Sequence, residues 1–527
     1  MNIWTVAREY SGIAEAGGVK DVSCALSESL VRIGETVTLF IPLYGCTDLS
    51  SINDFTCVWH RPVEISVCQK RMIVTFSCGT KNGVNIVFIG NKAFSEKNAV
   101  YTYTCDDEQK NPNHKKGLGH EDAQFLNTLF QKAVVAYGRT CSAEEAPDII
   151  FCHDATAAMV PVFVHFAKER DRELFHFYRN TSCIVTIHNA GSGYHHIYKN
   201  VDEAVYYTNL PEEFLAGGLN GMRVEPFVLA AHFAKLTTVS PQYASEIMDS
   251  TIDTGELSEL FRRDKRSVIG ITNGIDFEFY DPANSRTSCL PFAYNPANGD
   301  FTGKYKCRDF LISNWASDSS KIDTGYCIAR YGFLKETVDN PVYIAYHGRV
   351  VRQKGISVLV QSAEKILQSN IGAKFIFIGQ GEKELEESLI QLAERHGGDC
   401  VYFQGYDKSL SRLCIAAADI AVFPSNFEPC GTADFVAQIL GTLCLAHATG
   451  GLKKIVDGET GFLYEPNTPE VLYDYLYSLI RLINRAGRDI FRPMLSYTAA
   501  YIKNNYSWDI ITREKYLPLF KELMQNK

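Results

Sequence analysis

The segment "HGRVVRQKG" places two cations, Arg349 and Lys354, five residues apart between a strand-like run and a helical run. Such a loop binds anions well, because backbone N–H groups and the dipole of the following helix add to the fixed positive charge. The arrangement therefore suits a diphosphate. A solvated basic loop is the alternative interpretation, since charge clusters are common in loops.

A carboxylate, Glu428, lies in "PSNFEPCGTADFVAQ", after the strand-like run "IAVFP" and just before a helical run. Gly431 in the same loop allows a ligand to approach the backbone closely, and a carboxylate there can accept hydrogen bonds from sugar hydroxyls. Without a ligand, Glu428 would simply compensate the positive end of the helix. The later segment "HATGGLKKIVDGETGF" adds a glycine pair that either lines a phosphate pocket or forms a turn.

Polar side chains also follow two apolar strands in the first half of the chain. His153 and Asp154 end "PDIIFCHD", and His188 and Asn189 follow "SCIVTI". These groups are candidates for a binding site, because ligands of open α/β sheets bind at the carboxyl ends of strands. A hydrogen-bonded structural histidine is the alternative in each case. Asn273, in "ITNGID", is a further candidate or part of a tight turn.

A glycine pair, Gly17 and Gly18, separates the first strand-like run from the first helical run. Two residues without Cβ let a ligand reach the N–H groups of this loop, although the pair could serve the turn alone. The same loop carries Glu15, and Lys20 follows in the first helical turn.

Alternating strand-like and helical runs position these segments. Residues 1–6, 18–33 and "ETVTLFIPLYG" form a βαβ unit, and after a polar, turn-rich passage the alternation restarts at "PVYIAYHGRV". We therefore predict an α/β fold of two Rossmann-like, doubly wound domains that face each other across a cleft. The predicted parts are an N-terminal domain over 1–283, an interdomain region over 284–340, a C-terminal domain over 341–505, and a C-terminal helix over 506–527 that could return to the first domain.

Composition and charge argue against several classes of protein. A net charge of -9 disfavours nucleic acid as a partner, because nucleic-acid domains carry a basic stripe. Sixteen scattered cysteines without a CxxC pair indicate neither a zinc site nor a disulfide scaffold, so we expect reduced thiols, no metal and no cofactor. The sequence shows no signal-like segment and no long apolar run, which predicts a cytoplasmic protein with no membrane partner.

Five segments in a fixed order resemble the bacterial glycogen synthase and plant starch synthase family, retaining glucosyltransferases of the GT-B fold. They are "HDATAAMVP", "TTVSPQYASEI", "ITNGIDFEFYDP", "GRVVRQKG" and "PSNFEPCG", the last followed at the usual spacing by "GTLCLAHATGGLKKIVDGETGF". The resemblance implies transfer of glucose from a nucleotide-glucose to the nonreducing end of an α-1,4-glucan such as glycogen. ADP-glucose is the favoured donor and UDP-glucose the alternative.

The resemblance also implies a role for each candidate residue. Arg349 and Lys354 would neutralise the departing diphosphate, and Glu428 would bind hydroxyls of the donor glucose. His188 would contact the transferred sugar, and Asp154 would position or stabilise the sugar as it becomes positively charged. No covalent nucleophile is required. The residues implied in donor binding are Gly17, Gly18, Asn273, Tyr406, Cys430, Gly431 and Thr432, with Tyr406 stacking on the base.

The chain departs from the family pattern at several positions. Glu15 stands where the family has a lysine, and Lys20 is a candidate to supply the missing charge. Asp434 stands where a glutamine is usual, and His447 and Ala448 stand where basic residues are usual. These departures keep two other functions open, a GT-B transferase with another acceptor and a degenerate, non-catalytic homologue that binds glucan. The sequence does not indicate an oligomeric state.

Overall fold

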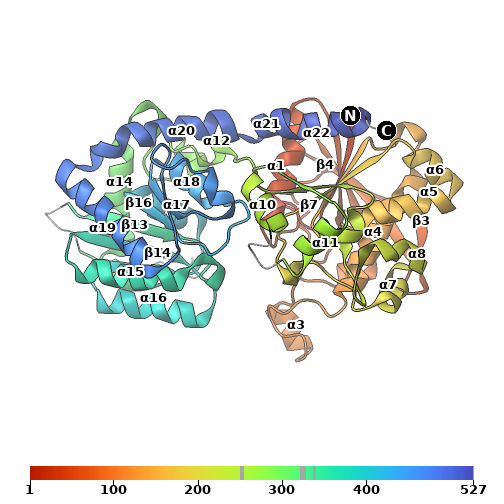
Figure 1. The fold of residues 1–527 in the computed structure, drawn as a ribbon, viewed down its shortest axis with the longest axis horizontal. Coiled ribbons are helices and arrows are strands. Elements are labelled where there is room, and N and C mark those ends of the chain that lie inside the picture. The colour runs from red at the N-terminus through yellow and green to blue at the C-terminus, as the bar shows by residue number, and fades with distance from the viewer. Residues whose placement is uncertain (250–253, 321–327, 336–339, 526–527) are drawn as a thin grey trace. The chain divides into compact units, whose positions relative to one another are not determined.

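The computed structural model describes residues 1–249, 254–320, 328–335 and 340–525. The chain forms two compact units, each an α/β structure with helices on both faces of a central sheet (Figure 1). Unit 1 comprises Met1–Gly274 and Trp508–Lys527, and unit 2 comprises Ile275–Ser507.

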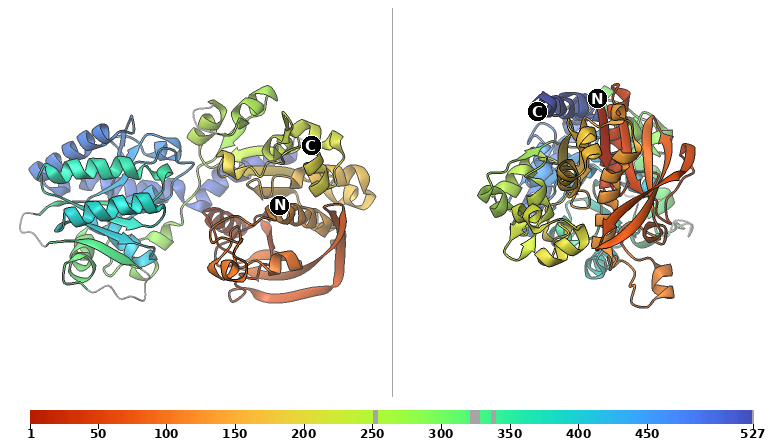
Figure 2. Two further views of the ribbon diagram at one scale, coloured as in Figure 1. Left: turned by 90° about the horizontal axis from the view of Figure 1, so that it is seen from below. Right: turned by 90° about the vertical axis from the view of Figure 1, so that its right-hand side faces the viewer.

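Unit 1 is built on a nine-stranded sheet in the order β11, β10, β7, β6, β1, β2, β5, β4, β3. The strands from β11 to β5 are parallel, whereas β4 and β3 form an antiparallel hairpin at one edge, the long orange pair in Figure 2. In sheet order the strands are Val268–Gly270, Lys235–Thr238, Ser182–Ile187, Ile149–His153, Asn2–Val6, Thr36–Pro42, Val84–Gly90, Lys70–Lys81 and Asn53–Val67. The helices α1 to α11 are Val19–Arg32, Lys92–Ser95, Cys105–Lys110, Ala123–Tyr137, Val160–Arg170, Arg172–Tyr178, Val201–Thr208, Glu212–Leu215, Pro226–Ala230, Pro241–Asp249 and Leu257–Arg263, and α21 and α22 are Trp508–Ile511 and Leu517–Gln525.

Unit 2 is built on a seven-stranded sheet in the order β12, β15, β14, β13, β16, β17, β18, in which only β12 is antiparallel to its neighbour. In sheet order the strands are Ala329–Leu334, Asp399–Gln404, Ala373–Gly379, Val342–His347, Ile420–Phe423, Leu443–His447 and Phe462–Tyr464. The helices α12 to α20 are Phe277–Tyr280, Ser285–Ser288, Thr302–Leu311, Ile356–Gln368, Lys383–Arg395, Lys408–Ala417, Ala433–Ile439, Pro469–Ala486 and Arg492–Tyr506.

The sheet of unit 2 is apolar on both faces, as expected for parallel strands covered by helices on each side. Along β14, Phe375 and Phe377 pack into the core under α15, α16 and α19, while Ile376 and Ile378 pack into the core under α14, α17 and α18. The alternation of side chains along a strand therefore divides one apolar run between two cores.

The division of the chain differs from the boundaries predicted from composition. The described residues of 284–340, the segment predicted as an interdomain region, lie within unit 2, where Tyr294 and Leu311 are buried in the same core as α17 and α18. Lys304 and Arg308 of α14 reach the end of α17 and donate hydrogen bonds to Ala416 O and Ala417 O, which fixes this polar segment to the unit. Residues 508–527 belong to unit 1.

Each sheet has one point at which the strand order reverses. In unit 1 the chain moves outward from β1 through β2 and β5 on one side, and through β6, β7 and β10 on the other. In unit 2 it moves from β13 through β14 and β15 on one side, and through β16 and β17 on the other. Loops that leave neighbouring strands in opposite directions open a crevice at such a switch point, where open α/β sheets bind their ligands.

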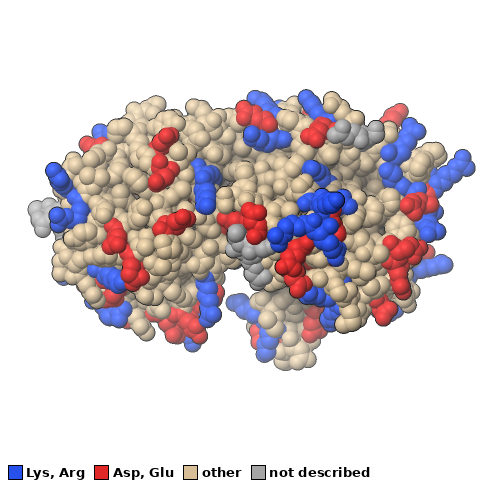
Figure 3. All heavy atoms as spheres, in the orientation of Figure 1, with Lys and Arg blue, Asp and Glu red and all other residues tan. Residues whose placement is uncertain are grey.

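The charged side chains show no basic stripe on the face drawn in Figure 3, where Lys and Arg are interspersed with Asp and Glu. Among the described residues, no helix is long and apolar enough to cross a membrane.

Candidate active site

The loops after β13 and β16 meet at the switch point of unit 2. Lys354, from the first loop, forms an ion pair with Glu428, from the second. Ser425 Oγ donates a hydrogen bond of 3.1 Å to the same carboxylate oxygen of Glu428. Glu428 is only 9% exposed, and Asn426 N donates to Gln353 O at 2.8 Å, so side-chain and main-chain contacts hold the two loops together.

Arg349 lies in the loop after β13 with its side chain exposed. Its guanidinium donates to Gln353 Oε1 at 3.3 Å, and it forms no ion pair with any residue that the structure describes. Burial and the charge of Lys354 lower the pKa of the adjacent His347 to about 4, so this imidazole is neutral near pH 7. The positive charge of Arg349 is therefore not offset by a carboxylate of the described chain.

Glycines bring these loops close together. Gly355 has φ +67°, and a Cβ at this position would lie 1.8 Å from Pro424 O of the β16 loop. Gly451 packs against Cys430, since a Cβ on it would lie 2.0 Å from Cys430 O, and its N–H donates to Glu428 O at 2.7 Å. The second glycine of the pair at 450–451 thus supports the loop that carries Glu428.

The other candidates of unit 2 lie in the same loops or beside them. Cys430 is buried, Gly431 has φ +73°, and Thr432 is exposed just before α18. Tyr406 follows β15 and is 65% exposed, which leaves its ring open to a stacking partner.

The loops after β6 and β7 hold the candidate pair of unit 1. Asp154 follows β6 with φ +61°, in the left-handed region that non-glycine residues seldom occupy outside functional sites and turns. Its Oδ1 accepts a hydrogen bond of 2.7 Å from the backbone N–H of His188, which follows β7. Burial raises the pKa of Asp154 to about 7, with a contribution from Glu9, while backbone N–H groups oppose the shift.

His188 is paired with a second histidine. Its Nε2 lies 2.9 Å from Nδ1 of His153, and both rings are buried. Burial lowers the pKa of His188 to about 3 and that of His153 well below its ordinary value, so both imidazoles are neutral near pH 7. One ring must therefore donate the single hydrogen between them.

We assign that hydrogen to His153. The Nε2 atom of His153 is buried and has no hydrogen-bond partner among the described residues. A hydrogen on Nε2 would be a buried donor without an acceptor, whereas a hydrogen on Nδ1 is donated to His188. His188 then carries its own hydrogen on Nδ1, which makes that nitrogen a donor.

The glycine loop of unit 1 is occupied by a carboxylate of the chain itself. Glu9, which is 1% exposed, accepts hydrogen bonds from the backbone N–H groups of Gly17 and Ala16. A Cβ on Gly17 would lie 3.2 Å from Glu9 Oε1, whereas one on Gly18 would meet open space. The Gly17 N–H, predicted to face a ligand, is therefore already used, and only Gly18 offers an open approach.

Glu15 and Lys20 are held by local contacts. Glu15 accepts a hydrogen bond of 2.6 Å from Gly12 N. Lys20 Nζ lies 2.8 Å from Asp21 Oδ1 and 3.9 Å from Glu15 Oε2. The positive charge of Lys20 is thus offset by two carboxylates, so this loop has no excess positive charge.

Asn273 lies after β11 in unit 1 and is 5% exposed. Its Oδ1 atom is buried and has no hydrogen-bond partner among the residues described. The neighbouring Gly274 packs on Trp508, since a Cβ there would lie 2.7 Å from the indole ring. An unused buried acceptor is costly, and it is consistent with an atom that serves a ligand.

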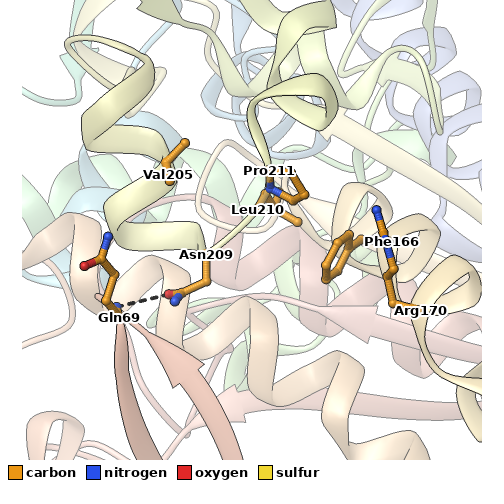
Figure 4. A pocket seen from close by; sticks show the side chains of 7 residues that line it. All are labelled: Gln69, Phe166, Arg170, Val205, Asn209, Leu210 and Pro211. Atoms are coloured by element: carbon orange, nitrogen blue, oxygen red, sulfur yellow. Dashed lines mark hydrogen bonds between the residues drawn. The ribbon is translucent and has the colours of Figure 1, made fainter.

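A surface pocket of about 540 Å³ lies elsewhere on unit 1 (Figure 4). Gln69 N donates to Asn209 Oδ1 at 3.2 Å on one side of it. No predicted site residue lines this pocket, and we assign it no role. The residues that line the pocket are Gln69, Phe166, Arg170, Val205, Asn209, Leu210 and Pro211.

The described residues contain no group of three or more His, Cys, Asp or Glu side chains that could hold a metal ion.

The structure thus brings Lys354 and Glu428 together in unit 2, and Asp154 and His188 together in unit 1. Sequence reasoning missed the role of Glu9, although its position shortly after the first strand was a usable signal. It also missed Lys454, whose contacts are mainly with backbone carbonyls and which the sequence pattern therefore did not indicate.

Comparison with known proteins gives matches over both units. A family described as "Starch synthase catalytic domain" matches residues 2–263, and one described as "Glycosyl transferases group 1" matches residues 333–486. A glycogen synthase of Thermodesulfovibrio yellowstonii is 26% identical, with 99% of this chain and 98% of that protein covered. A glycogen synthase of Streptococcus pneumoniae is 27% identical, with 99% of this chain and 100% of that protein covered.

Solved structures share the fold. The catalytic domain of starch synthase IV from Arabidopsis thaliana, bound to ADP and acarbose, matches with a TM-score of 0.78 at 22% identity, covering 99% of each chain. A sucrose-phosphate synthase from Thermosynechococcus elongatus matches with a TM-score of 0.56 at 15% identity, covering 100% of each chain.

Proposed function

Because the chain belongs to the glycogen synthase and starch synthase family of glycosyltransferases, we propose that it transfers glucose from a nucleotide-glucose donor to the nonreducing end of an α-1,4-glucan such as glycogen. The observation that carries this proposal is the Lys354–Glu428 pair beside the exposed Arg349 at the switch point of unit 2. One pair of loops thus carries two cations, which suit a diphosphate, together with a carboxylate, which suits sugar hydroxyls.

In this enzyme unit 2 binds the donor. Arg349 and Lys354 stabilise the negative charge that develops on the leaving diphosphate, the kind of electrostatic stabilisation that supplies a large part of many rate enhancements. Glu428 binds hydroxyls of the donor glucose, and Tyr406 stacks on the base. The backbone of Cys430, Gly431 and Thr432 contacts the phosphates. ADP-glucose is the favoured donor, supported by the ADP bound to the structurally similar starch synthase IV.

Unit 1 acts on the transferred sugar. His188, a neutral donor through Nδ1, contacts a hydroxyl of the sugar, and the Asp154 carboxylate stabilises the positive charge of the oxocarbenium-like transition state. The buried acceptor of Asn273 completes this group, and in the glycine loop Gly18 leaves open space for a ligand. The acceptor hydroxyl attacks the anomeric carbon from the side that the nucleoside diphosphate leaves, and its proton passes to the departing diphosphate. The configuration at the anomeric carbon is therefore retained without a glycosyl-enzyme intermediate.

We also propose that the enzyme acts in the cytoplasm and needs neither metal nor cofactor. No disulfide bond joins the cysteines whose side chains the structure describes, which suits a reducing compartment.

The test is to incubate the purified protein with glycogen and either ADP-glucose or UDP-glucose. We expect release of the nucleoside diphosphate and incorporation of α-1,4-linked glucose into the polymer, faster with ADP-glucose. Absence of transfer from both donors would refute the proposal. Donor binding without turnover would instead support a non-catalytic homologue, and transfer only to other acceptors a different transferase.

A further inference from the structure

Lys454 lies in the loop after β17, next to the loop that carries Glu428, with its side chain only 5% exposed. Its ammonium lies 3.0 Å and 2.8 Å from the two carboxylate oxygens of Asp434, which is fully buried. It also donates to three backbone carbonyls, those of Cys430 at 2.6 Å, Gly431 at 3.0 Å and Gly451 at 3.0 Å. One buried cation therefore joins the loops after β16 and β17.

The two carbonyls of Cys430 and Gly431 determine where the adjoining N–H groups point. Both peptide bonds are trans, since the only cis bond among the described residues is Glu465–Pro466. In a planar trans peptide the C=O and N–H vectors point in opposite directions. Because both carbonyls point at Lys454, the N–H groups of Gly431 and Thr432 point away from it.

These two N–H groups have no hydrogen-bond acceptor among the residues that the structure describes. Gly431 has φ +73°, and Thr432 has φ -121° and ψ -22°, so successive N–H groups lie on one side of the chain and form an anion-binding nest. A Cβ on Gly431 would lie 2.9 Å from Asp434 Oδ1, which requires glycine here.

Asp434 occupies the position where the family pattern has a glutamine. Its carboxylate gives the buried Lys454 a counter-charge, although burial still holds the pKa of Asp434 above its ordinary value. Phe435 covers the other side of the ammonium, with the ring centroid 4.5 Å from Nζ. A buried lysine without such a partner would be strongly destabilising.

We propose that Lys454, neutralised by Asp434, is a positioning residue that turns the N–H groups of Gly431 and Thr432 toward the donor diphosphate. This inference rests on the proposed function only for the identity of the ligand. Lys454 does not touch the donor; it acts through the peptide groups that it orients.

The experiment compares Lys454→Met with the double variant Asp434→Leu/Lys454→Met in the full chain. The single variant leaves Asp434 buried and unpaired, so both Tm and donor binding should fall. The double variant replaces the ion pair by two apolar side chains, which often restores stability. We expect it to recover most of the lost Tm, while the Kd of ADP and UDP and the KM of the donor stay raised about tenfold, because hydrogen bonds to a charged group have been lost.

Lys374→Met is the matched control. Lys374 is 1% exposed, donates to Gly398 O and lies 2.9 Å from Asp399 Oδ1, but it lies at the amino end of β14, away from the loops after β16 and β17. We expect this variant to lose stability as Lys454→Met does, with an unchanged Kd for ADP and UDP.

The inference fails if the double variant regains its Tm and also binds ADP and UDP within about twofold of the wild type. It also fails if Lys374→Met weakens binding as much as Lys454→Met, because the effect would then follow from stability alone. A wild-type protein that binds these nucleotides without transferring glucose refutes the proposed function but still tests Lys454. A wild type that binds neither nucleotide refutes both.

Discussion

At the switch point of unit 2, two cations, Arg349 and Lys354, accompany one carboxylate, Glu428. At the switch point of unit 1, two carboxylates, Glu9 and Asp154, and two neutral imidazoles accompany the buried cation Arg8, whose guanidinium donates to Tyr44, Asn127 and the carbonyl of Val100. In both sheets the strand order reverses at one point, and in both units these polar groups follow the carboxyl ends of the strands. The difference is in the residues that follow the strands. The same backbone arrangement thus provides a positive environment in one unit and a negative or neutral one in the other.

This contrast matches the two charges that develop in glucosyl transfer. The leaving diphosphate gains negative charge, which the cations of unit 2 suit, and the sugar gains positive charge, which the carboxylate of Asp154 suits. Unit 1 also uses Glu9 to occupy the N–H groups at Ala16 and Gly17, a position at which other α/β proteins bind phosphate. A carboxylate there disfavours a second anion, so we expect unit 1 to be a poor site for the diphosphate.

The largest loss of activity is expected when both cations of unit 2 are removed. We expect Arg349→Ala/Lys354→Ala to lower kcat by about 10³ or more, since loss of one preorganised electrostatic contact costs about 10²–10³. The measurement is nucleoside diphosphate release at saturating glycogen, with a Tm to show that the variant is folded.

Arg352→Ala serves as the control for the basic loop. Arg352 is exposed and already lies 3.5 Å from carboxylate oxygens of Glu382 and Glu384, so we expect kcat within about twofold of the wild type. Equal losses in Arg352→Ala and in the double variant would mean that only the total charge of the loop matters.

The carboxylate of unit 1 offers the second test. We expect Asp154→Asn to lower kcat by about 10², because the amide keeps the volume and tolerates the left-handed φ but carries no charge. The same steady-state assay measures it. Turnover within about threefold of the wild type would show that Asp154 only supports the backbone of His188.

The pH dependence of the wild type sharpens this result. The pKa of Asp154 is raised to about 7 by burial, so its carboxylate form, which the proposed function requires, is populated only as the pH rises through 7. We expect kcat/KM to rise with a midpoint near pH 7, and this rise to disappear in Asp154→Asn.

The stability of the protein depends on pH in the opposite direction. An acid whose pKa is raised in the folded state makes the protein less stable as the pH rises above the unfolded pKa of that acid. The Tm at pH 8 should therefore be higher in Asp154→Asn than in the wild type.

The histidine pair of unit 1 has a smaller expected effect. His153→Phe removes the donor to His188 Nε2 and should lower kcat/KM about tenfold, the cost of one lost buried hydrogen bond. His153→Asn places an amide near the Nδ1 position and should retain most of the activity. If both variants lose the same activity with the same Tm, the hydrogen assigned to His153 Nδ1 has no role in orienting His188.

The parallel core of each unit was predictable from sequence, because its strands are short apolar runs separated by helical periodicity. The hairpin of β3 and β4 was not, since its turn at Cys68 and Gln69 has φ +53° and +58° without the glycine or asparagine that usually marks such turns. The segment 284–340 contains many turn residues, and its place in unit 2 depends on contacts of Lys304 and Arg308 with residues more than 100 positions away.

The residues of the candidate site were predictable where a charged side chain lies in the loop directly after a strand. Lys354 and Glu428 were found in this way, and the structure pairs them. What sequence reasoning could not show is which backbone groups are already occupied. The sequence made the Gly17 N–H a candidate to face a ligand, whereas in the structure this group donates to Glu9. The sequence did not indicate a role for Lys454, because its acceptors are mostly main-chain carbonyls.

The smallest effect is expected at the loop where the family has a lysine and this chain has Glu15. A lysine at this place would add a cation to unit 1, and Lys20 was the candidate to replace it. Its ammonium instead lies 2.8 Å from Asp21 and 3.9 Å from Glu15, so little of its charge is available to a ligand. We expect Lys20→Ala to change the donor KM and kcat by less than about twofold, because ion pairs near the surface contribute little. A tenfold rise in donor KM, measured beside Arg349→Ala, would instead show that unit 1 supplies a cation to the diphosphate and that the two switch points share this task.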